Sequence, residues 1–179
     1  MLTVETGAII AGAESYVTAA ECDTYHTNRG NATWTGTDTA KEAALRKAAA
    51  YLDSHYRRRW KGNRVYPLHQ FMEWPRYGVD IGNMAPMIGG VYLNGAILNQ
   101  FLPSDEIPQR VKDAQCELAL RALSADLNTD IATGVVSKKV DVLETTYNPY
   151  STRQTIYPFV DSLLSDYLKS ANSCEAVRG

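Results

Sequence analysis

The stretch "TAKEAALRKAAAYLDSHYRRRWKG", residues 39–62, carries the strongest helix signal in the chain. Alanine, the best helix former, dominates its first turns, and Thr39 and Glu42 have the spacing of a capping box. Apolar side chains recur every three or four residues and form one stripe: Leu45, Ala48, Ala49, Leu52, Tyr56 and Trp60. We therefore expect a long amphipathic helix that Gly62 closes and that packs against other helices.

Three weaker patterns predict the partners of this helix. Thr18 and Glu21 form a capping box, so a short helix is expected from near Thr18 to near Gly30. A second helix is expected after Pro108, a residue suited to the first helical position. A third is expected over about 158–170. The apolar faces of these last two helices are Val111, Ala114, Leu118 and Leu123, and Val160, Leu163, Leu164, Tyr167 and Leu168.

The remaining segments lack helical periodicity. Residues 63–105 are rich in proline and glycine and predict a long irregular insertion, with a hairpin around Asn94-Gly95. Residues 134–156 contain many β-branched side chains and predict a strand or extended arm, and residues 1–14 an extended or loose segment. The expected fold is mainly α: a small helical bundle in one domain, residues 1–170, followed by a polar tail at 171–179.

Composition limits the possible functions. The formal net charge is -2, with 18 basic and 20 acidic side chains, whereas a general nucleic-acid binder is normally clearly basic. The cysteines Cys22, Cys116 and Cys174 form no CxxC pair, which fits a reducing cytoplasm. The start "MLTVETGAIIAG" lacks the basic region of a signal peptide, and no apolar run reaches the ~18 to 20 residues of a membrane span.

Catalytic motifs are absent from the sequence. His26, His55 and His69 form no zinc-binding pattern, and surface or satisfied core positions explain them best. The glycines of "GNMAPMIGG" lack the spacing of a dinucleotide-binding or P-loop motif, and there is no GxSxG elbow. We expect no enzyme activity, no metal and no cofactor.

The basic residues at the end of the long helix are the main candidates for a functional site: Arg57, Arg58, Arg59, Lys61 and Arg64. Three consecutive arginines on a helix fan over about 200 degrees and cannot form one flat grip. One explanation is a solvated helix end, where positive charge complements the helix dipole. The other is contact with phosphate or with an acidic protein surface, which the planar guanidinium group favours.

Six aromatic side chains lie in and around this basic stretch: Trp34, Trp60, Tyr66, Phe71, Trp74 and Tyr77. Aromatic rings interleaved with arginine can stack on the bases of single-stranded nucleic acid. Tryptophan, however, buries so much area that such residues more often anchor a loop to the core. We favour the core explanation.

The order of several motifs resembles a known family. These are "SYVTAAECDTYHTNRGNATW", "KEAALRKAAAYLDSHYRRRWKGNR", "FMEWPRYGV", "IPQRVKDAQCELALRAL", "KKVDVLETTY" and "YPFVDSLLSDYL". Together they cover most of residues 15–170 and resemble the head–tail connector or adaptor (head-completion) proteins of tailed bacteriophages. The same sequence group also carries the label DnaT-like single-stranded-DNA-binding protein. Residues 77–105 are longer than the usual pattern and suggest an elaboration that contacts a neighbouring subunit or a tail protein.

The adaptor resemblance implies a structural virion protein at the head–tail interface, made in the cytoplasm of the host bacterium. Such proteins form a ring, typically of twelve copies, under the portal protein, extend the channel for double-stranded DNA and dock the next tail component, a tail-terminator or nozzle protein. The basic cluster would then line the channel or a subunit interface. The resemblance also implies a set of portal-docking candidates: Tyr157, Phe159, Leu163, Leu164, Tyr167 and Leu168.

The alternative is a replication protein that binds single-stranded DNA. Its site would combine the basic residues 57–64 with Trp60, Tyr66 and Trp74. The adaptor is the expectation that we favour, because the net charge is negative and the aromatic residues are better explained as core.

Overall fold

The mainly α fold class is confirmed. The computed structural model describes residues 1–81, 101–128 and 155–169 in full, and only the backbone of residues 92–93, 96–97, 137–140 and 143–146. These residues contain four α-helices and one 3-10 turn: α1 (Ala19–Asn28), α2 (Asp38–Tyr56), α3 (Gln109–Ala122), α4 (Pro158–Leu164) and η1 (Ser165–Tyr167).

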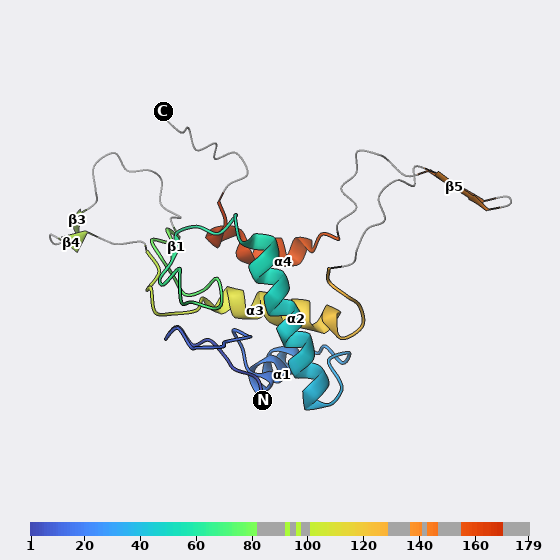
Figure 1. The fold of residues 1–179 in the computed structure, drawn as a ribbon, viewed down its shortest axis with the longest axis horizontal. Coiled ribbons are helices and arrows are strands. Elements are labelled where there is room, and N and C mark those ends of the chain that lie inside the picture. Colours follow the sequence, from blue (N-terminus) through green and yellow to red (C-terminus); the bar gives the residue numbers. More distant parts are fainter. Residues whose placement is uncertain are drawn as a thin grey trace.

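Helix α3 is the centre of the bundle. It contacts all three other helices, α1, α2 and α4. Figure 1 shows α2 crossing α3 and α4, with its first turns near α1 and its last turns near α4. The apolar stripe predicted for α2 faces this centre: Leu45, Ala48, Ala49, Leu52 and Tyr56 are buried.

The start of α1 is confirmed and the predicted start of α2 is wrong. Thr18 and Glu21 form the expected capping box, in which the Thr18 hydroxyl accepts from the Glu21 N–H at 3.1 Å. The cap of α2 is Thr37 rather than Thr39, and the Thr37 hydroxyl accepts from a backbone N–H at 3.3 Å. Thr37 has extended backbone angles and follows Gly36, whose φ of 127° makes the turn into the helix.

Helix α2 also ends earlier than predicted, at Tyr56 instead of Gly62. The backbone of the next residues bonds to the C-terminal segment instead of continuing the helix. Lys61 N–H donates to the Tyr167 carbonyl at 2.9 Å, and Lys169 N–H donates to the Arg59 carbonyl at 2.7 Å. A helix cannot use the same groups, so this pairing prevents α2 from continuing to Gly62.

The same pairing shortens the C-terminal helix. We expected residues 158–170, but α4 ends at Leu164, η1 follows, and Leu168 is extended and bridges Trp60. Pro158 opens α4 as predicted. We expected Pro108 at the first position of α3. It occupies the N-cap position instead, and α3 begins at Gln109.

Three short antiparallel ladders complete the description. β1 (Asn63–Arg64) pairs with β2 (Arg76–Tyr77), and β3 (Tyr92–Leu93) pairs with β4 (Ala96–Ile97) on either side of the predicted turn. β5 (Ser137–Val140) pairs with β6 (Leu143–Thr146) inside the predicted extended arm. The rest of the insertion and arm and the predicted tail at 171–179 lie outside the described residues.

Residues 1–14 contain no helix, but they are neither extended throughout nor loose, because the chain turns at residues 11–12 and folds back on itself. Val4 bridges Ser15, and the fully buried Glu5 carboxylate accepts from the backbone N–H groups of Gly7, Ile9 and Ile10 at 2.8 to 2.9 Å. Within the described residues, no helix has the length and hydropathy needed to cross a membrane.

Candidate contact surface at residues 57–77

Three arginines converge on one buried carboxylate, Glu73. Arg76 Nη1 lies 2.9 Å from Glu73 Oε2, Arg57 Nε lies 3.3 Å from Oε1, and Arg64 Nη1 lies 3.9 Å from Oε1. Arg76 is itself buried and donates to the carbonyls of Lys61 and Gly62. Three arginines of this stretch are therefore paired with one carboxylate inside the subunit, which offsets one of their three positive charges.

Arg59 and Lys61 join the end of α2 to the C-terminal segment. Arg59 pairs with Asp161 of α4 at 3.3 Å, and its guanidinium lies 5.2 Å from the centre of the Tyr56 ring. Lys61 Nζ donates to the backbone carbonyls of Asp80 and Asp166 at 3.1 and 2.9 Å. Both side chains thus make contacts within the subunit.

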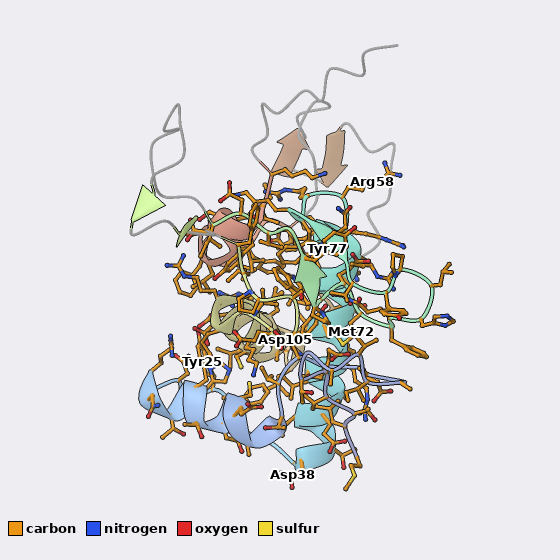
Figure 2. All side chains as sticks on the ribbon, turned by 90° about the vertical axis from the view of Figure 1, so that its left-hand side faces the viewer. Tyr25, Asp38, Arg58, Met72, Tyr77 and Asp105 are labelled. Carbon is orange, nitrogen blue, oxygen red and sulfur yellow. The ribbon has the colours of Figure 1, made fainter. Side chains whose placement is uncertain are left out.

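Arg58 differs from the other four basic candidates. It is exposed, and in the part of the chain that the structure describes it makes no ion pair or hydrogen bond. Figure 2 shows it beyond the end of α2, directed away from the helices. Arg57, although paired with Glu73, also keeps 68% of its side chain exposed. The predicted basic cluster therefore has three exposed arginines: Arg58, which has no partner among the described residues, and Arg57 and Arg59, which are each paired with one carboxylate.

The six aromatic candidates divide into two groups. The tryptophans Trp34, Trp60 and Trp74 are buried, at 8%, 1% and 0% exposure, as the core explanation predicts. Trp60 and Trp74 pack edge to face with ring centres 5.5 Å apart. For the other three the core explanation is wrong: Tyr66, Phe71 and Tyr77 are 57%, 66% and 50% exposed.

The exposed rings lie on a segment, residues 64–77, whose backbone is held together by the buried side chain of Gln70. Gln70 Nε2 donates to the carbonyls of Met72 and Pro75 at 2.9 Å, and its Oε1 accepts from Tyr66 N–H at 3.2 Å. The β1–β2 ladder closes the base of the segment, which places Tyr77 opposite Asn63. Because these bonds fix the backbone, the exposed rings stand on a rigid support.

A buried hydrogen-bond network joins the 64–77 segment to α2. The hydroxyl of Tyr16 donates to Asp53 Oδ1 and accepts from the N–H groups of Glu73 and Trp74 at 3.1 and 3.2 Å. Asp53 Oδ2 accepts from Glu73 N–H at 3.1 Å. Burial raises the pKa of the Asp53 carboxyl to about 7, and the negative charge of Glu73 adds to this effect. Asp53 lies 37 positions from Tyr16 and 20 from Glu73 in the sequence, so periodicity along one helix could not reveal this network.

Most of the portal-docking candidates pack against the core of their own subunit. Leu164 and Leu168 are buried, and Tyr157, Leu163 and Tyr167 are partly buried against the core. Phe159 is 50% exposed and is the one exposed residue of the six candidates. Docking through this segment stays a prediction.

The histidines have structural surroundings. His26 is buried, its Nε2 lies 3.1 Å from the Cys116 carbonyl, and its Nδ1 lies 3.0 Å from Asn31 Nδ2. His55 is half-buried and stacks on Tyr51, while His69 is exposed on the 64–77 segment. Among the described residues, no three His, Cys, Asp or Glu side chains gather as a metal site would require.

Comparison with known proteins gives one match, which spans residues 1–179. The matching family is described as "Putative DnaT-like ssDNA binding protein". The chain belongs to this family. No curated protein and no solved structure matches it.

The DnaT-like family description agrees with the alternative drawn from the sequence, single-stranded DNA binding, better than with the favoured adaptor. The residues of that alternative are only partly available. Trp60 and Trp74 are buried, which leaves Tyr66 of the three rings expected to stack on bases. Phe71 and Tyr77, which the sequence assigned to the core, are exposed and could take their place.

Proposed function

We propose that this member of the DnaT-like family is a structural, non-catalytic subunit of a bacteriophage particle, a head-to-tail adaptor. In this proposal it forms a ring under the portal protein, extends the DNA channel and docks a tail component. The observation that carries the proposal is that most arginines of the basic stretch are already paired with carboxylates of the same subunit. Arg57, Arg64 and Arg76 share Glu73, and Arg59 pairs with Asp161.

Arginines that are paired within the subunit suit a channel protein, because DNA must slide past it and such arginines are less available to hold phosphates. A tight DNA binder neutralises many phosphates with unpaired cations and loses affinity steeply as salt rises. Here the net charge of the chain is -2. Weak, non-specific contact with double-stranded DNA is what such a surface supports.

The exposed apolar side chains support contacts with protein. Three apolar side chains of the 64–77 segment are more than half exposed: Tyr66, Leu68 and Phe71. Phe101, which lies later in the sequence, is 56% exposed. Exposed large apolar side chains that cluster on a monomer commonly mark protein interfaces, and aromatic residues are enriched there. In the adaptor these residues would contact a neighbouring copy, the portal or the tail component.

Assembly with the portal tests the adaptor proposal. The protein is mixed with the portal protein encoded by the same phage genome, and complexes are measured by size-exclusion chromatography with light scattering and by electron microscopy. We expect ring-shaped complexes with the portal, weakened by Phe71→Ser and unaffected by Lys47→Ala, an exposed change on the middle of α2. Absence of any complex over a range of salt and protein concentration would refute the adaptor.

A second candidate function is the binding of single-stranded DNA, which the family description favours. The surface for it combines the exposed Arg57 and Arg58 with the rings of Tyr66, Phe71 and Tyr77. Aromatic stacking contributes about 1 to 3 kcal/mol per base, so two or three rings with two arginines can give measurable affinity.

A fluorescence anisotropy titration with an oligothymidylate strand separates the two functions. If single-stranded DNA is the ligand, binding at physiological salt is submicromolar, falls at least tenfold in Tyr66→Ala/Phe71→Ala, and falls in Arg58→Ala. Lys47→Ala is the matched control, because it removes an exposed positive charge from α2, about 14 Å along the helix from Tyr56, the residue at which α2 ends before Arg58. Binding weaker than about 100 μM, or equal effects of both charge variants, removes this candidate.

A further inference from the structure

Two buried thiols face each other between α1 and α3. Cys22 of α1 is 0% exposed, Cys116 of α3 is 2% exposed, and both are free. They are 94 positions apart in the sequence, so no local motif signals the pair. Their meeting depends on how the two helices lie against each other.

Polar contacts between α1 and α3 place the two cysteines opposite each other. Lys112 Nζ lies 3.8 Å from Glu21 Oε1, and the Tyr25 hydroxyl donates to Glu117 Oε1 at 3.1 Å. Glu21 and Tyr25 flank the cysteine of α1 within one turn, and Lys112 and Glu117 flank the cysteine of α3 in the same way. The cysteine of each helix thus lies between two contacts with the other helix.

A third contact brings the thiols themselves together. His26, one turn after Cys22 on α1, has its Nε2 3.1 Å from the backbone carbonyl of Cys116. Residues four apart on a helix share a face, so Cys22 is directed to α3 as His26 is. The Cys116 thiol donates a hydrogen bond to the Cys22 sulfur. The two sulfur atoms are therefore in contact across the interface of the helices.

A hollow between α1 and α3 gives small molecules a route to this pair. It has a volume of about 370 Å³, opens to solvent, and is lined by Cys116 together with polar side chains such as Glu21, Thr24 and Lys112. A water molecule takes up roughly 30 Å³ in the liquid, so hydrogen peroxide, a polar molecule only slightly larger, fits the hollow easily. The thiols are thus buried but within reach of a small oxidant.

We propose that Cys22 and Cys116 form a reversible disulfide when the protein meets a peroxide, and that this bond joins α1 to α3 covalently. One sulfur first takes an oxygen atom from hydrogen peroxide and becomes a sulfenic acid, and the rest of the peroxide leaves as water. The second sulfur then displaces the hydroxyl group, which leaves as water with the proton of the second thiol, and the S–S bond forms. Two electrons pass from the pair to the peroxide, and an external thiol such as dithiothreitol returns them.

The surroundings of Cys116 make this oxidation slow at neutral pH. The hydrogen bond to Cys22 raises the pKa of the Cys116 thiol, and burial raises it further. Because the thiolate is the reactive form, the pair should stay reduced in a reducing cytoplasm and oxidise faster as pH rises. A phage particle released from the cell would meet oxidising surroundings; that step rests on the proposed function, whereas the disulfide itself does not.

Mass spectrometry of the folded, full-length protein tests the disulfide. The protein is treated with hydrogen peroxide at about pH 8, its remaining thiols are alkylated, and it is digested without reduction. We expect a mass lower by two hydrogen atoms, a peptide pair that joins Cys22 to Cys116, and return to the starting mass with dithiothreitol. The same treatment in concentrated urea is the matched control, because the unfolded chain should also form pairs with Cys174. In Cys174→Ala the folded protein should form the Cys22–Cys116 pair as before.

Urea unfolding measures what the bond does to the fold. The disulfide closes a long loop in the unfolded chain, so the oxidised protein should unfold at a urea concentration roughly 1 M or more above that of the reduced protein. Peroxide should not raise the midpoint of Cys22→Ala or Cys116→Ala, and the mass measurement stays decisive if these variants fold poorly, since it needs neither.

Three results would overturn the disulfide proposal. They are a folded protein that forms no Cys22–Cys116 bond where the unfolded chain does, sulfinic acids in place of the bond, and a cross-linked protein whose urea midpoint is unchanged or lower. None of them bears on the adaptor or DNA-binding tests, which depend on other residues.

Discussion

Replacing Glu73 by glutamine should destabilise the protein more than any other single loss of charge in the 57–77 stretch. The change keeps the shape of the side chain but leaves three arginines without their shared counter-charge. Arg76 matters most, because it is as buried as Glu73 and lies 2.9 Å from it. Removing one partner of a buried ion pair costs about 3 to 5 kcal/mol. Glutamine can still accept a hydrogen bond from Arg76, so we expect the lower end, about 3 kcal/mol.

Urea unfolding measures this free energy. With m of about 1 to 3 kcal/mol/M, a loss of about 3 kcal/mol lowers the midpoint by roughly 1 to 3 M. The matched control is Glu14→Gln, which breaks the exposed pair with Arg46 at 2.8 Å and should leave the midpoint unchanged. Arg57→Ala should have a small effect, because that arginine is 68% exposed. If Glu73→Gln unfolds within 0.5 M of the unmodified protein, Glu73 does not balance the arginines, and the argument for a channel surface fails.

Two further predictions compare neighbouring or matched positions. Thr37→Ala should cost about 1 kcal/mol because Thr37 caps α2, whereas Thr39→Ala should cost much less; thermal unfolding of both variants checks the cap, and equal effects would contradict it. Gly7→Ala should destabilise the fold strongly, since a Cβ there would overlap the backbone oxygen of Asp105 and φ is 109°. Gly12 has φ of 71° but open space around it, so Gly12→Ala should be strained and cost much less stability than Gly7→Ala. A urea titration in which Gly12→Ala costs more stability than Gly7→Ala would refute the packing described for residues 1–14.

The helices could be predicted because their signals are local. Each signal depends on residues within a few positions of one another: the cap at Thr18, the apolar stripe of α2, and Pro158 at the start of α4. The end of α2 could not be predicted in the same way. It depends on backbone bonds between residues 59–61 and 167–169, which are more than a hundred positions apart in the sequence.

The candidate surface shows the same division. Tryptophans are so large that core placement was the safer prediction, and Trp60 and Trp74 confirm it. The exposure of Tyr66 and Phe71 depends instead on Gln70. Its side-chain amide bonds to backbone groups inside the turn, and the two rings lie outside. A single glutamine in a proline-rich segment gives no sequence signal for that role.

The charge distribution narrows the choice of partner further. Residues 57–77 contain six basic side chains and one acidic one, although the net charge of the whole chain is -2. Internal pairing with Glu73 and Asp161 reduces this excess but does not remove it, since Arg58 has no partner in the described part of the chain. A partner at this surface should therefore be acidic as well as apolar. Single-stranded DNA and an acidic protein face both meet that condition, but they differ in salt dependence. Affinity for DNA falls by roughly one power of salt for each phosphate contacted, whereas an interface centred on Tyr66 and Phe71 keeps most of its affinity because apolar burial is not screened.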